Sequence, residues 1–319
     1  MTQITGFIRP KRRAGELGVH SIDGFNLVVP NLTEANAFYA AFGLDVRDER
    51  NGFGLHTKGR DHRWGGVNEG PSKKLSHISF GAFAEDLELL RGRLQDNGVK
   101  QLDAPAGFES NGIWFRDPDG TLLEVRVATK SSPDEKSVFS AISAPAGVQG
   151  APFRSKAPAV HPRRLAHVLV FSTDVLRTID FYQRVLGLRL SDRSGDGIAF
   201  MHGIHGSDHH MIAFAKSNGP GLHHLSWDVG SVDEVGIGAS QMADKGFTAG
   251  WGLGRHVLGS NYFHYVRDPW GSYCEYSADI DYIPADHDWA SGDRPSEDAF
   301  YLWGPTPPAD FVVNYEATP

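Results

Sequence analysis

Two stretches of this 319-residue chain repeat one another, Arg116-Asp-Pro-Asp-Gly-Thr-Leu-Leu-Glu124 and Arg267-Asp-Pro-Trp-Gly-Ser-Tyr-Cys-Glu275. Both read Arg-Asp-Pro-x-Gly, followed by a short strand-like run that contains a glutamate. Asp, Pro and Gly in this order indicate a tight turn, so each stretch predicts a turn that leads into a strand. An internal match at an offset of 151 residues indicates that one structural unit has been duplicated.

Two further matches extend the repeat. Leu75-Ser-His-Ile-Ser-Phe80 matches Leu222-His-His-Leu-Ser-Trp227, and Ala37-Phe-Tyr-Ala-Ala-Phe-Gly-Leu44 matches Asp180-Phe-Tyr-Gln-Arg-Val-Leu-Gly-Leu188. The second pair is typical of an amphipathic helix that ends at a glycine. The sequence therefore predicts an α+β protein with five segments. These are an N-terminal extension (1–19), an N-terminal domain (20–128), a linker rich in Ser, Ala, Pro and Gly (129–160), a C-terminal domain (161–278) and a tail (279–319).

In the second half, apolar runs between turn residues predict six strands and two helices. The expected strands are 165–171, 197–202, 209–215, 223–229, 261–267 and 272–277, and the expected helices are 174–186 and 231–245. We expect the tail, which has no repeat partner, to cover an opening in the fold.

Three of these strands carry a residue that can bind a metal, namely His167, His224 and Glu275. Two imidazoles and one carboxylate on one face of a divalent ion are typical of mononuclear non-haem Fe(II) oxygenases. Any one of the three is equally well explained as a satisfied polar residue at a barrel edge. Because side chains alternate along a strand, we expect His223 to point away from His224, and Cys274 to point away from Glu275.

The first half keeps only part of this set. His77 corresponds to His224 and Glu124 to Glu275, but about Gly24 stands where the second half has His167. Two protein ligands hold a divalent ion poorly, so we expect the first half to be metal-free and architectural.

Three further residues lie near the expected ligands. His210 precedes His224 by 14 residues, and we expect two strands joined through Asn218-Gly-Pro-Gly to bring it beside the metal. His256 and Tyr265 lie nine residues apart, and Tyr265 lies ten residues before Glu275. A neutral imidazole can accept and return a proton, and a tyrosine hydroxyl can stabilise an oxyanion. Taken alone, His256 is equally well explained as a loop residue; His202, His205 and His264 are expected to be structural, and His209 to be exposed or next to the site.

Composition excludes several classes of protein. The formal net charge of −8 argues against a nucleic-acid partner, which needs a basic surface. Cys274 is the one cysteine, so no internal disulfide can form, and a reducing cytoplasm is expected. The chain has no run of about 18 apolar residues, so the sequence predicts no membrane span. The basic residues near the N-terminus (Arg9, Lys11, Arg12 and Arg13) precede no apolar run, so we expect no secretory signal.

The second half resembles the type I extradiol ring-cleaving dioxygenases of the vicinal oxygen chelate superfamily. The matching residues are Leu165-Ala-His167, His210 to His224 with its Asn-Gly-Pro turn, Gly254-Arg-His256, and Tyr265 through Asp268-Pro-Trp-Gly to Glu275. These cover most of 160–285, and the duplicated 20–128 matches the two-domain layout of that family.

The resemblance implies paired βαβββ modules, two in each domain. It also implies that His167, His224 and Glu275 bind Fe(II), with Mn(II) as the alternative ion. His210 would be the acid/base, His256 would form a hydrogen bond near a bound catechol oxygen, and Tyr265 would help to hold the substrate. The implied partners are a catecholic small molecule and O2, and relatives are usually homo-oligomers.

Two positions depart from the pattern of the family. Trp270 stands where many relatives have Asp or Asn, and Trp251 stands where some relatives with acidic substrates carry Arg. The second departure argues against a carboxylated catechol. Two other functions remain open: a glyoxalase-type isomerase or thiol transferase with a different metal, and a non-catalytic ligand-binding protein.

Overall fold

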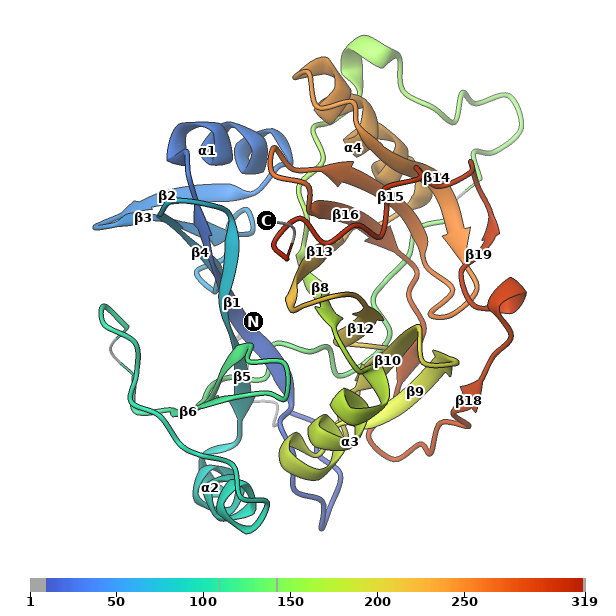
Figure 1. Ribbon diagram of the computed structural model, residues 1–319. Coiled ribbons are helices and arrows are strands. Elements are labelled where there is room, and N and C mark those ends of the chain that lie inside the picture. The colour runs from blue at the N-terminus through green and yellow to red at the C-terminus, as the bar shows by residue number, and fades with distance from the viewer. Residues whose placement is uncertain (1–9, 109, 142, 318–319) are drawn as a thin grey trace, which may run out of the picture.

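A computed structural model describes residues 10–108, 110–141 and 143–317. Residues 1–9 of the expected N-terminal extension and 318–319 of the expected tail lie outside this range. The chain forms two large sheets, each built from βαβββ-type modules placed side by side (Figure 1). The predicted α+β class with paired modules is confirmed.

The first sheet has the strand order β2-β3-β4-β1-β5-β7-β6. One module consists of β1 (Ser21–Val29), α1 (Leu32–Ala41), β2 (Asp45–Glu49), β3 (Gly52–His56) and β4 (Arg63–Glu69). The next consists of β5 (Lys74–Ala82), a short 3-10 turn (Ala84–Asp86), α2 (Leu87–Asp96), β6 (Ile113–Arg116) and β7 (Leu122–Val127). This second module has one strand fewer, and a single bridge between Leu102 and Trp114 stands in its place.

The second sheet has the order β18-β9-β10-β12-β8-β13-β16-β15-β14-β19. Its modules are β8 (Arg164–Ser172), α3 (Val175–Leu186), β9 (Arg189–Ser194), β10 (Ile198–His202) and β12 (Ile212–Lys216), then β13 (Gly221–Asp228), α4 (Val232–Asp244), β14 (Gly250–His256), β15 (Tyr262–Arg267) and β16 (Tyr273–Ala278). A 3-10 turn (Arg154–Lys156) precedes this half. The remaining elements are β11 (Ser207–Asp208), β17 (Tyr282–Ile283), β18 (Gly292–Asp293), a 3-10 turn (Ser296–Asp298) and β19 (Tyr301–Trp303).

The two Arg-Asp-Pro-x-Gly stretches form the same turn. Asp117 Oδ1 accepts the backbone N–H groups of residues 119 and 121, and Asp268 Oδ1 accepts those of residues 270 and 272. The glycine in each turn has positive φ, 90° at Gly120 and 99° at Gly271, which a residue with a side chain rarely adopts. The motif therefore starts the last strand of the second module in each half, β7 and β16, at a fixed place.

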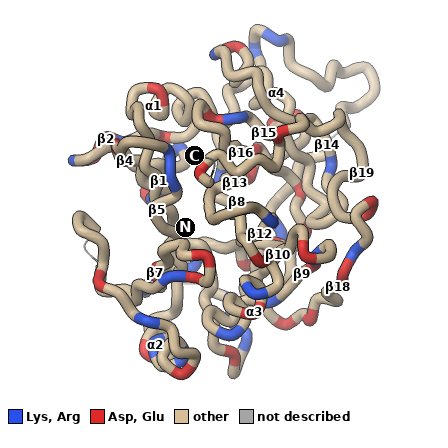
Figure 2. The backbone as a smooth tube through the Cα atoms, in the orientation of Figure 1, with Lys and Arg blue, Asp and Glu red and all other residues tan. Residues whose placement is uncertain are grey.

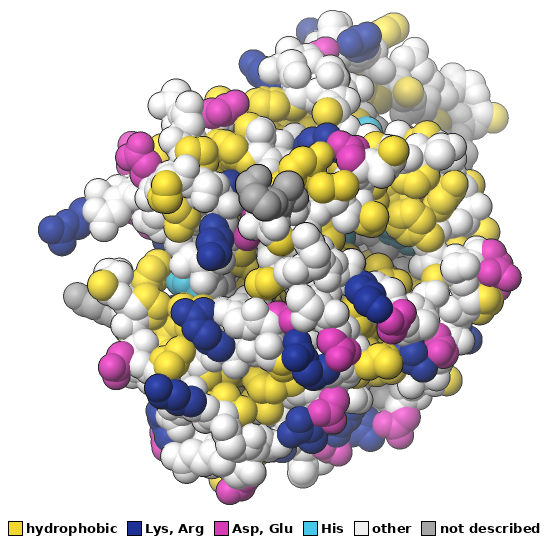
Figure 3. Space-filling model, in the orientation of Figure 1, with side chains coloured by type: hydrophobic (Ala, Val, Ile, Leu, Met, Phe, Trp, Pro, Cys, Tyr) yellow, Lys and Arg dark blue, Asp and Glu magenta, His cyan; other side chains and the backbone are white. Residues whose placement is uncertain are grey.

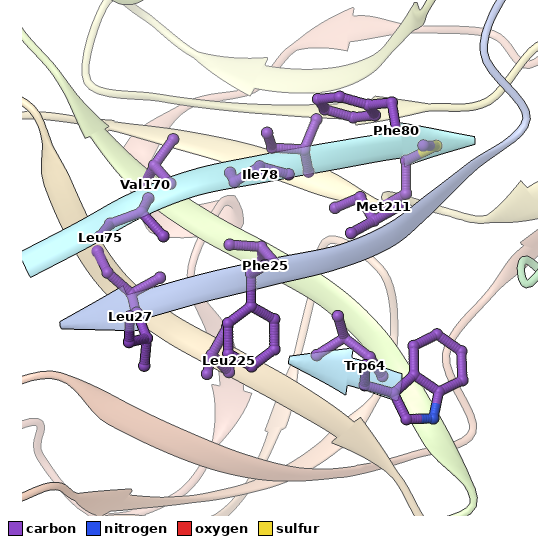
Figure 4. Close-up of a cluster of buried hydrophobic side chains, with 14 of the residues drawn as sticks. Phe25, Leu27, Trp64, Leu75, Ile78, Phe80, Val170, Met211 and Leu225 are labelled. Atoms are coloured by element: carbon purple, nitrogen blue, oxygen red, sulfur yellow. The ribbon is translucent and has the colours of Figure 1, made fainter. Parts of the chain in front are cut away.

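The two halves pack face to face around one hydrophobic core. Figure 4 shows Phe25 and Leu27 of β1 and Ile78 of β5 in one cluster with Val170 of β8 and Leu225 of β13. These strands form the centre of each sheet, so the repeat places the two sheet centres against each other.

A buried ion pair also joins the halves. Lys73, just before β5, lies 2.5 Å from Glu316 near the C-terminus, and both side chains are almost fully buried. The Glu316 carboxylate accepts the backbone N–H groups of Leu75 and Leu222, which are equivalent positions of the repeat. The end of the tail thus holds the starts of β5 and β13 together.

Charged side chains of both signs are scattered along the chain (Figure 2). Within the described residues, no helix is long and apolar enough to cross a bilayer.

Candidate metal centre

Three adjacent strands of the second sheet bring His167, His224 and Glu275 together. His167 lies on β8 and Glu275 on β16, and both pair in register with Ser226 of the strand between them, β13. His224 lies two residues before Ser226, on the same face of that strand. Among the described residues, these three form the only group of three or more side chains that could hold a metal ion.

The donor atoms have the spacing that a divalent ion requires. His167 Nε2 lies 3.1 Å from His224 Nε2, and Glu275 Oε2 lies 3.2 Å and 3.7 Å from these two nitrogens. Bonds of about 2.1 Å at right angles to one another would separate neighbouring donors by about 3 Å. Glu275 Oε2 is buried and lacks a well-aligned hydrogen-bond donor. A buried carboxylate oxygen without a donor is costly, so these residues fit a bound cation.

The surroundings of His224 and Glu275 favour the protonation states that metal binding needs. Loss of hydration lowers the pKa of His224 well below its ordinary value, which favours the neutral ring. Burial opposes ionisation of Glu275, but the neighbouring His167 ring holds the pKa of that carboxyl below its usual value. Neutral imidazole and ionised carboxylate are the forms that bind metal.

Two neighbouring side chains orient the expected ligands, and sequence reasoning missed both. Asn261 donates from Nδ2 to Glu275 Oε1 at 3.1 Å and to Ser277 at 3.0 Å, which leaves Oε2 facing the two histidines. His223 does not point away from the site as expected. A bulge between Leu222 and His224 turns the His223 ring toward the same cavity, where His223 Nδ1 lies 2.7 Å from His224 Nδ1. The His-His dipeptide at 223–224 was the available signal.

His210 lies beside the expected metal ligands, but not by the predicted route. The strand expected at 209–215 begins only at Ile212, and β12 does not pair with β13 because β8 lies between them. The loop before β12 brings the His210 ring to within 4.1 Å of the His167 ring, centroid to centroid. Burial lowers the pKa of His210 well below its ordinary value, so the ring is neutral.

His256 and Tyr265 form a second pair at the cavity. His256 ends β14, a strand that the apolar pattern did not predict, and Tyr265 lies on β15 level with Glu275. Tyr265 Oη and His256 Nε2 are 2.9 Å apart, and His256 Nδ1 lies 2.8 Å from the Phe300 carbonyl oxygen. His256 Nδ1 therefore donates to that carbonyl, and Tyr265 donates to Nε2. Burial raises the pKa of Tyr265 well above its ordinary value, so the hydroxyl keeps its proton.

A cavity with about 530 Å³ of empty space, part of it open to solvent, lies over these residues. Its walls are mostly apolar and include residues of the tail, the segment that we expected to cover an opening. The apolar lining residues are Leu169, Ile198, Phe200, Ala215, Leu258, Ala299, Phe300, Phe311 and Val312. Figure 3 shows hydrophobic side chains gathered over the edge formed by β14 and β19, with a histidine visible in a hollow beside them.

The equivalent place in the first half has a different composition. Ser79 of β5 pairs in register with both Gly24 and Glu124, as Ser226 does with His167 and Glu275. Gly24 therefore occupies the position of His167. Both oxygens of Glu124 accept hydrogen bonds, one from Ser79 and the other from Ser110.

Comparison with known proteins agrees with this architecture. The sequence profile of the Glyoxalase/Bleomycin resistance protein/Dioxygenase superfamily matches residues 21–125 and 164–276. Metapyrocatechase 2 of Cupriavidus necator is 52% identical over 94% of this chain and 93% of its own length.

Two solved structures of the same fold belong to enzymes of different kinds. A Mn(II)-bound glyoxalase from Novosphingobium aromaticivorans has a TM-score of 0.73 and 26% identity, and it covers 91% of this chain and 93% of its own. An extradiol ring-cleaving dioxygenase from B. fuscum has a TM-score of 0.74 and 22% identity, over 95% of this chain and 84% of its own. The high identity to metapyrocatechase 2 over nearly the whole chain decides between the two kinds. The chain therefore belongs to the Glyoxalase/Bleomycin resistance protein/Dioxygenase superfamily, as a member of its extradiol dioxygenases.

Proposed function

We propose that this extradiol dioxygenase uses Fe(II), held by His167, His224 and Glu275, to open the ring of a neutral, apolar-substituted catechol beside its diol. The observation that carries the proposal is the set of three donor atoms spaced 3.1–3.7 Å apart on adjacent buried strands. Two histidines and one carboxylate with open positions are typical of non-haem Fe(II) oxygenases. Mn(II) accepts the same ligands, so the choice of Fe(II) rests on the chemistry of the reaction.

When bound, the ion would supply open positions for both catechol hydroxyls and for O2, and it would make the hydroxyls more acidic. The residues around it would manage protons. His210 is neutral, and its ring lines the cavity next to His167, so it can accept a proton from a substrate hydroxyl and return it later. Tyr265 keeps its proton and, together with His256, offers a fixed hydrogen-bonding pair to a substrate oxygen.

The substrate class follows from the cavity walls. No Lys or Arg is among the described residues that line the cavity, and apolar side chains make up most of its surface. A carboxylate substituent would lose its hydration there without gaining a counter-charge. A methyl, alkyl or small aryl substituent would gain from contact with Phe200, Phe300 and Phe311.

The glyoxalase-type alternative draws support from the Mn(II)-bound structural relative. Isomerisation would need neither O2 nor a coloured product. Supplying the protein with a hemithioacetal in the absence of O2 would therefore detect it. A non-catalytic role would leave His210, His256 and Tyr265 without a function, although all three lie at the same cavity.

The test is O2 uptake by anaerobically purified protein reconstituted with Fe(II) or, in parallel, with Mn(II). A panel of neutral and carboxylated catechols would be offered, and the visible spectrum of each product recorded. Uptake coupled to a yellow ring-opened product, fastest with Fe(II) and with apolar-substituted catechols, is expected. Metal-bound protein that consumes no O2 with any catechol would contradict the proposal.

We further propose that the enzyme works in the cytoplasm as a homo-oligomer. The single cysteine, Cys274, is buried and needs no oxidising compartment. Light scattering coupled to size-exclusion chromatography would measure the assembly, and a monomer mass at working concentration would contradict the second part.

A further inference from the structure

The site contains two pairs of consecutive histidines, and in both pairs the two rings face each other through their Nδ1 atoms. His209 Nδ1 lies 3.0 Å from His210 Nδ1, and His223 Nδ1 lies 2.7 Å from His224 Nδ1. When both rings of a pair are neutral, one Nδ1 must carry the proton and donate, and the other must accept. The group that accepts from Nε2 of the first histidine of the pair decides which Nδ1 donates and which accepts.

In the 223–224 pair the direction is clear. His223 Nε2 lies 2.8 Å from the carbonyl oxygen of Phe311, which can only accept, so His223 carries its proton on Nε2. His223 Nδ1 then accepts from His224 Nδ1–H, and His224 Nε2 keeps its lone pair. That is the nitrogen that faces His167 and Glu275, as a metal ligand requires.

In the 209–210 pair a carboxylate takes the place of the carbonyl. His209 Nε2 lies 3.1 Å from Asp192 Oδ2, and Asp192 is buried. Arg294 Nε donates to Asp192 Oδ1 at 2.8 Å, the backbone N–H of Gly292 donates to Oδ1 at 3.1 Å, and Trp289 Nε1 donates to Oδ2 at 3.2 Å. A carboxylate oxygen can only accept, so His209 Nε2 carries a proton, and the lone pair of a neutral His209 ring lies on Nδ1.

We infer that Asp192, acting through His209, is a positioning device that fixes His210 as the Nδ1–H tautomer and leaves the Nε2 lone pair facing the cavity. Asp192 accepts from His209 Nε2–H, and His209 Nδ1 accepts from His210 Nδ1–H. The opposite tautomer would present an N–H group to the substrate and could not accept a proton. This inference rests on the proposed role of His210 as the proton acceptor.

The hydrogen bonds through His209 and Asp192 also connect His210 to the tail. Arg294, Gly292 and Trp289 all belong to the tail, and β18 pairs with β9 at Asp192. The carboxylate that directs the tautomer is therefore held on one side by the tail and on the other by His209. The acceptor beyond His223, the Phe311 carbonyl, is a tail group too.

Two substitutions of His209 separate the tautomer from the packing. His209→Asn keeps an oxygen near the position of Nδ1 and so keeps an acceptor for His210. His209→Gln reaches toward the position of Nε2, so it keeps the contact with Asp192 and the tail but removes that acceptor. The two variants are matched in polarity and close in size, so a purely structural role would not separate them in this order.

The first readout is independent of activity. Nuclear magnetic resonance of isotope-labelled histidine nitrogens in the metal-free protein reports which ring nitrogen carries the proton. We expect Nδ1–H for His210 in the unsubstituted protein and in His209→Asn, and a mixture of tautomers in His209→Gln. A doubly protonated His209, or an Nε2–H tautomer of His210 in the unsubstituted protein, would overturn the inference.

The second readout is kinetic. We expect His209→Gln to lower kcat by about 10–100-fold with little change in KM, and His209→Asn to restore most of the rate. In a His210→Gln background the two His209 variants should have the same kcat, because His209 then has nothing to orient. Equal kcat for the two variants in the native background would overturn the inference. Failure of the unsubstituted protein to cleave any catechol would instead overturn the proposed function, and the tautomer measurement would still decide the inference.

Discussion

At the scale of single residues, binding the metal and moving the proton are assigned to different side chains. Glu275 belongs to the proposed donor set, whereas His210 contacts the proposed ligand His167 without belonging to that set. We expect Glu275→Ala to lose the metal, and His210→Ala to keep it while kcat falls by about 10²–10⁴-fold, the usual worth of general acid–base catalysis. Metal analysis beside O2 uptake checks both, and full metal content in Glu275→Ala would contradict the assignment.

Asn261 makes a second residue-scale prediction. Its side chain holds Glu275 Oε1 and Ser277 at once, so its removal frees the carboxylate to rotate. We expect Asn261→Ala to weaken metal affinity by about 10–100-fold, as substitutions behind metal ligands generally do. Competition with a chelator measures this, and the control is Asn68→Ala, which changes a half-buried asparagine of the first half. Equal affinities for the two variants would mean that Asn261 does not orient the ligand.

At the scale of elements, the repeated turn and the three ligand strands follow from local sequence. Arg-Asp-Pro-x-Gly specifies its own turn through the aspartate side chain, and period-two patterns placed His167, His224 and Glu275 on β8, β13 and β16. Sequence reasoning also placed about Gly24 at the position equivalent to His167, and the strand register agrees.

Other elements left no readable local signal. β9 is a polar run, Arg-Leu-Ser-Asp-Arg-Ser, whose strand conformation comes from pairing with β10 and β18. The bulge that turns His223 into the cavity and the insertion of β8 between β12 and β13 are tertiary features that periodicity does not encode. The orienting roles of Asn261 and His209 likewise depend on contacts between different strands and loops.

The buried contacts of Glu316 give a prediction at the scale of elements. Its carboxylate joins Lys73 to the starts of β5 and β13, all within the protein interior. We expect Glu316→Ala to reduce the free energy of unfolding by about 3–5 kcal/mol, because it leaves the buried Lys73 ammonium without a counter-charge, with only the Ser272 hydroxyl to accept from it. Urea unfolding measures the loss. The exposed pair Arg184–Asp180 is the control, and its removal should change the midpoint little.

At the scale of the whole molecule, many histidine side chains are buried. Outside the candidate metal centre, burial lowers the pKa of several histidines from the ordinary value of 6.5. The lowered pKa is about 4 for His20, His77, His205 and His264, and about 3 for His202. Because the folded pKa lies below the unfolded one, each ring contributes stability above pH 6.5 that is lost as the pH falls toward the folded value.

We therefore expect the urea midpoint to fall between about pH 6.5 and pH 4. Asp117 acts in the opposite direction: burial raises its pKa from 3.8 to about 6, so the stability that its protonated form provides is lost as the pH rises through this range. The fully buried His20 offers the matched test: His20→Gln should unfold with a shallower dependence on pH. If the urea midpoint of the variant depends on pH as steeply as that of the unsubstituted protein, His20 does not contribute to the pH dependence of stability.

The whole-molecule account is that duplication built the scaffold, while only the second half holds a metal and performs ring cleavage. The most direct measurement is an iron-edge anomalous difference map from crystals of Fe(II)-loaded protein. The account predicts one strong peak per chain, about 2.0–2.2 Å from His167 Nε2, His224 Nε2 and Glu275 Oε2. A peak beside His77 and Glu124, or none at the three second-half donors in protein that cleaves catechol, would contradict it.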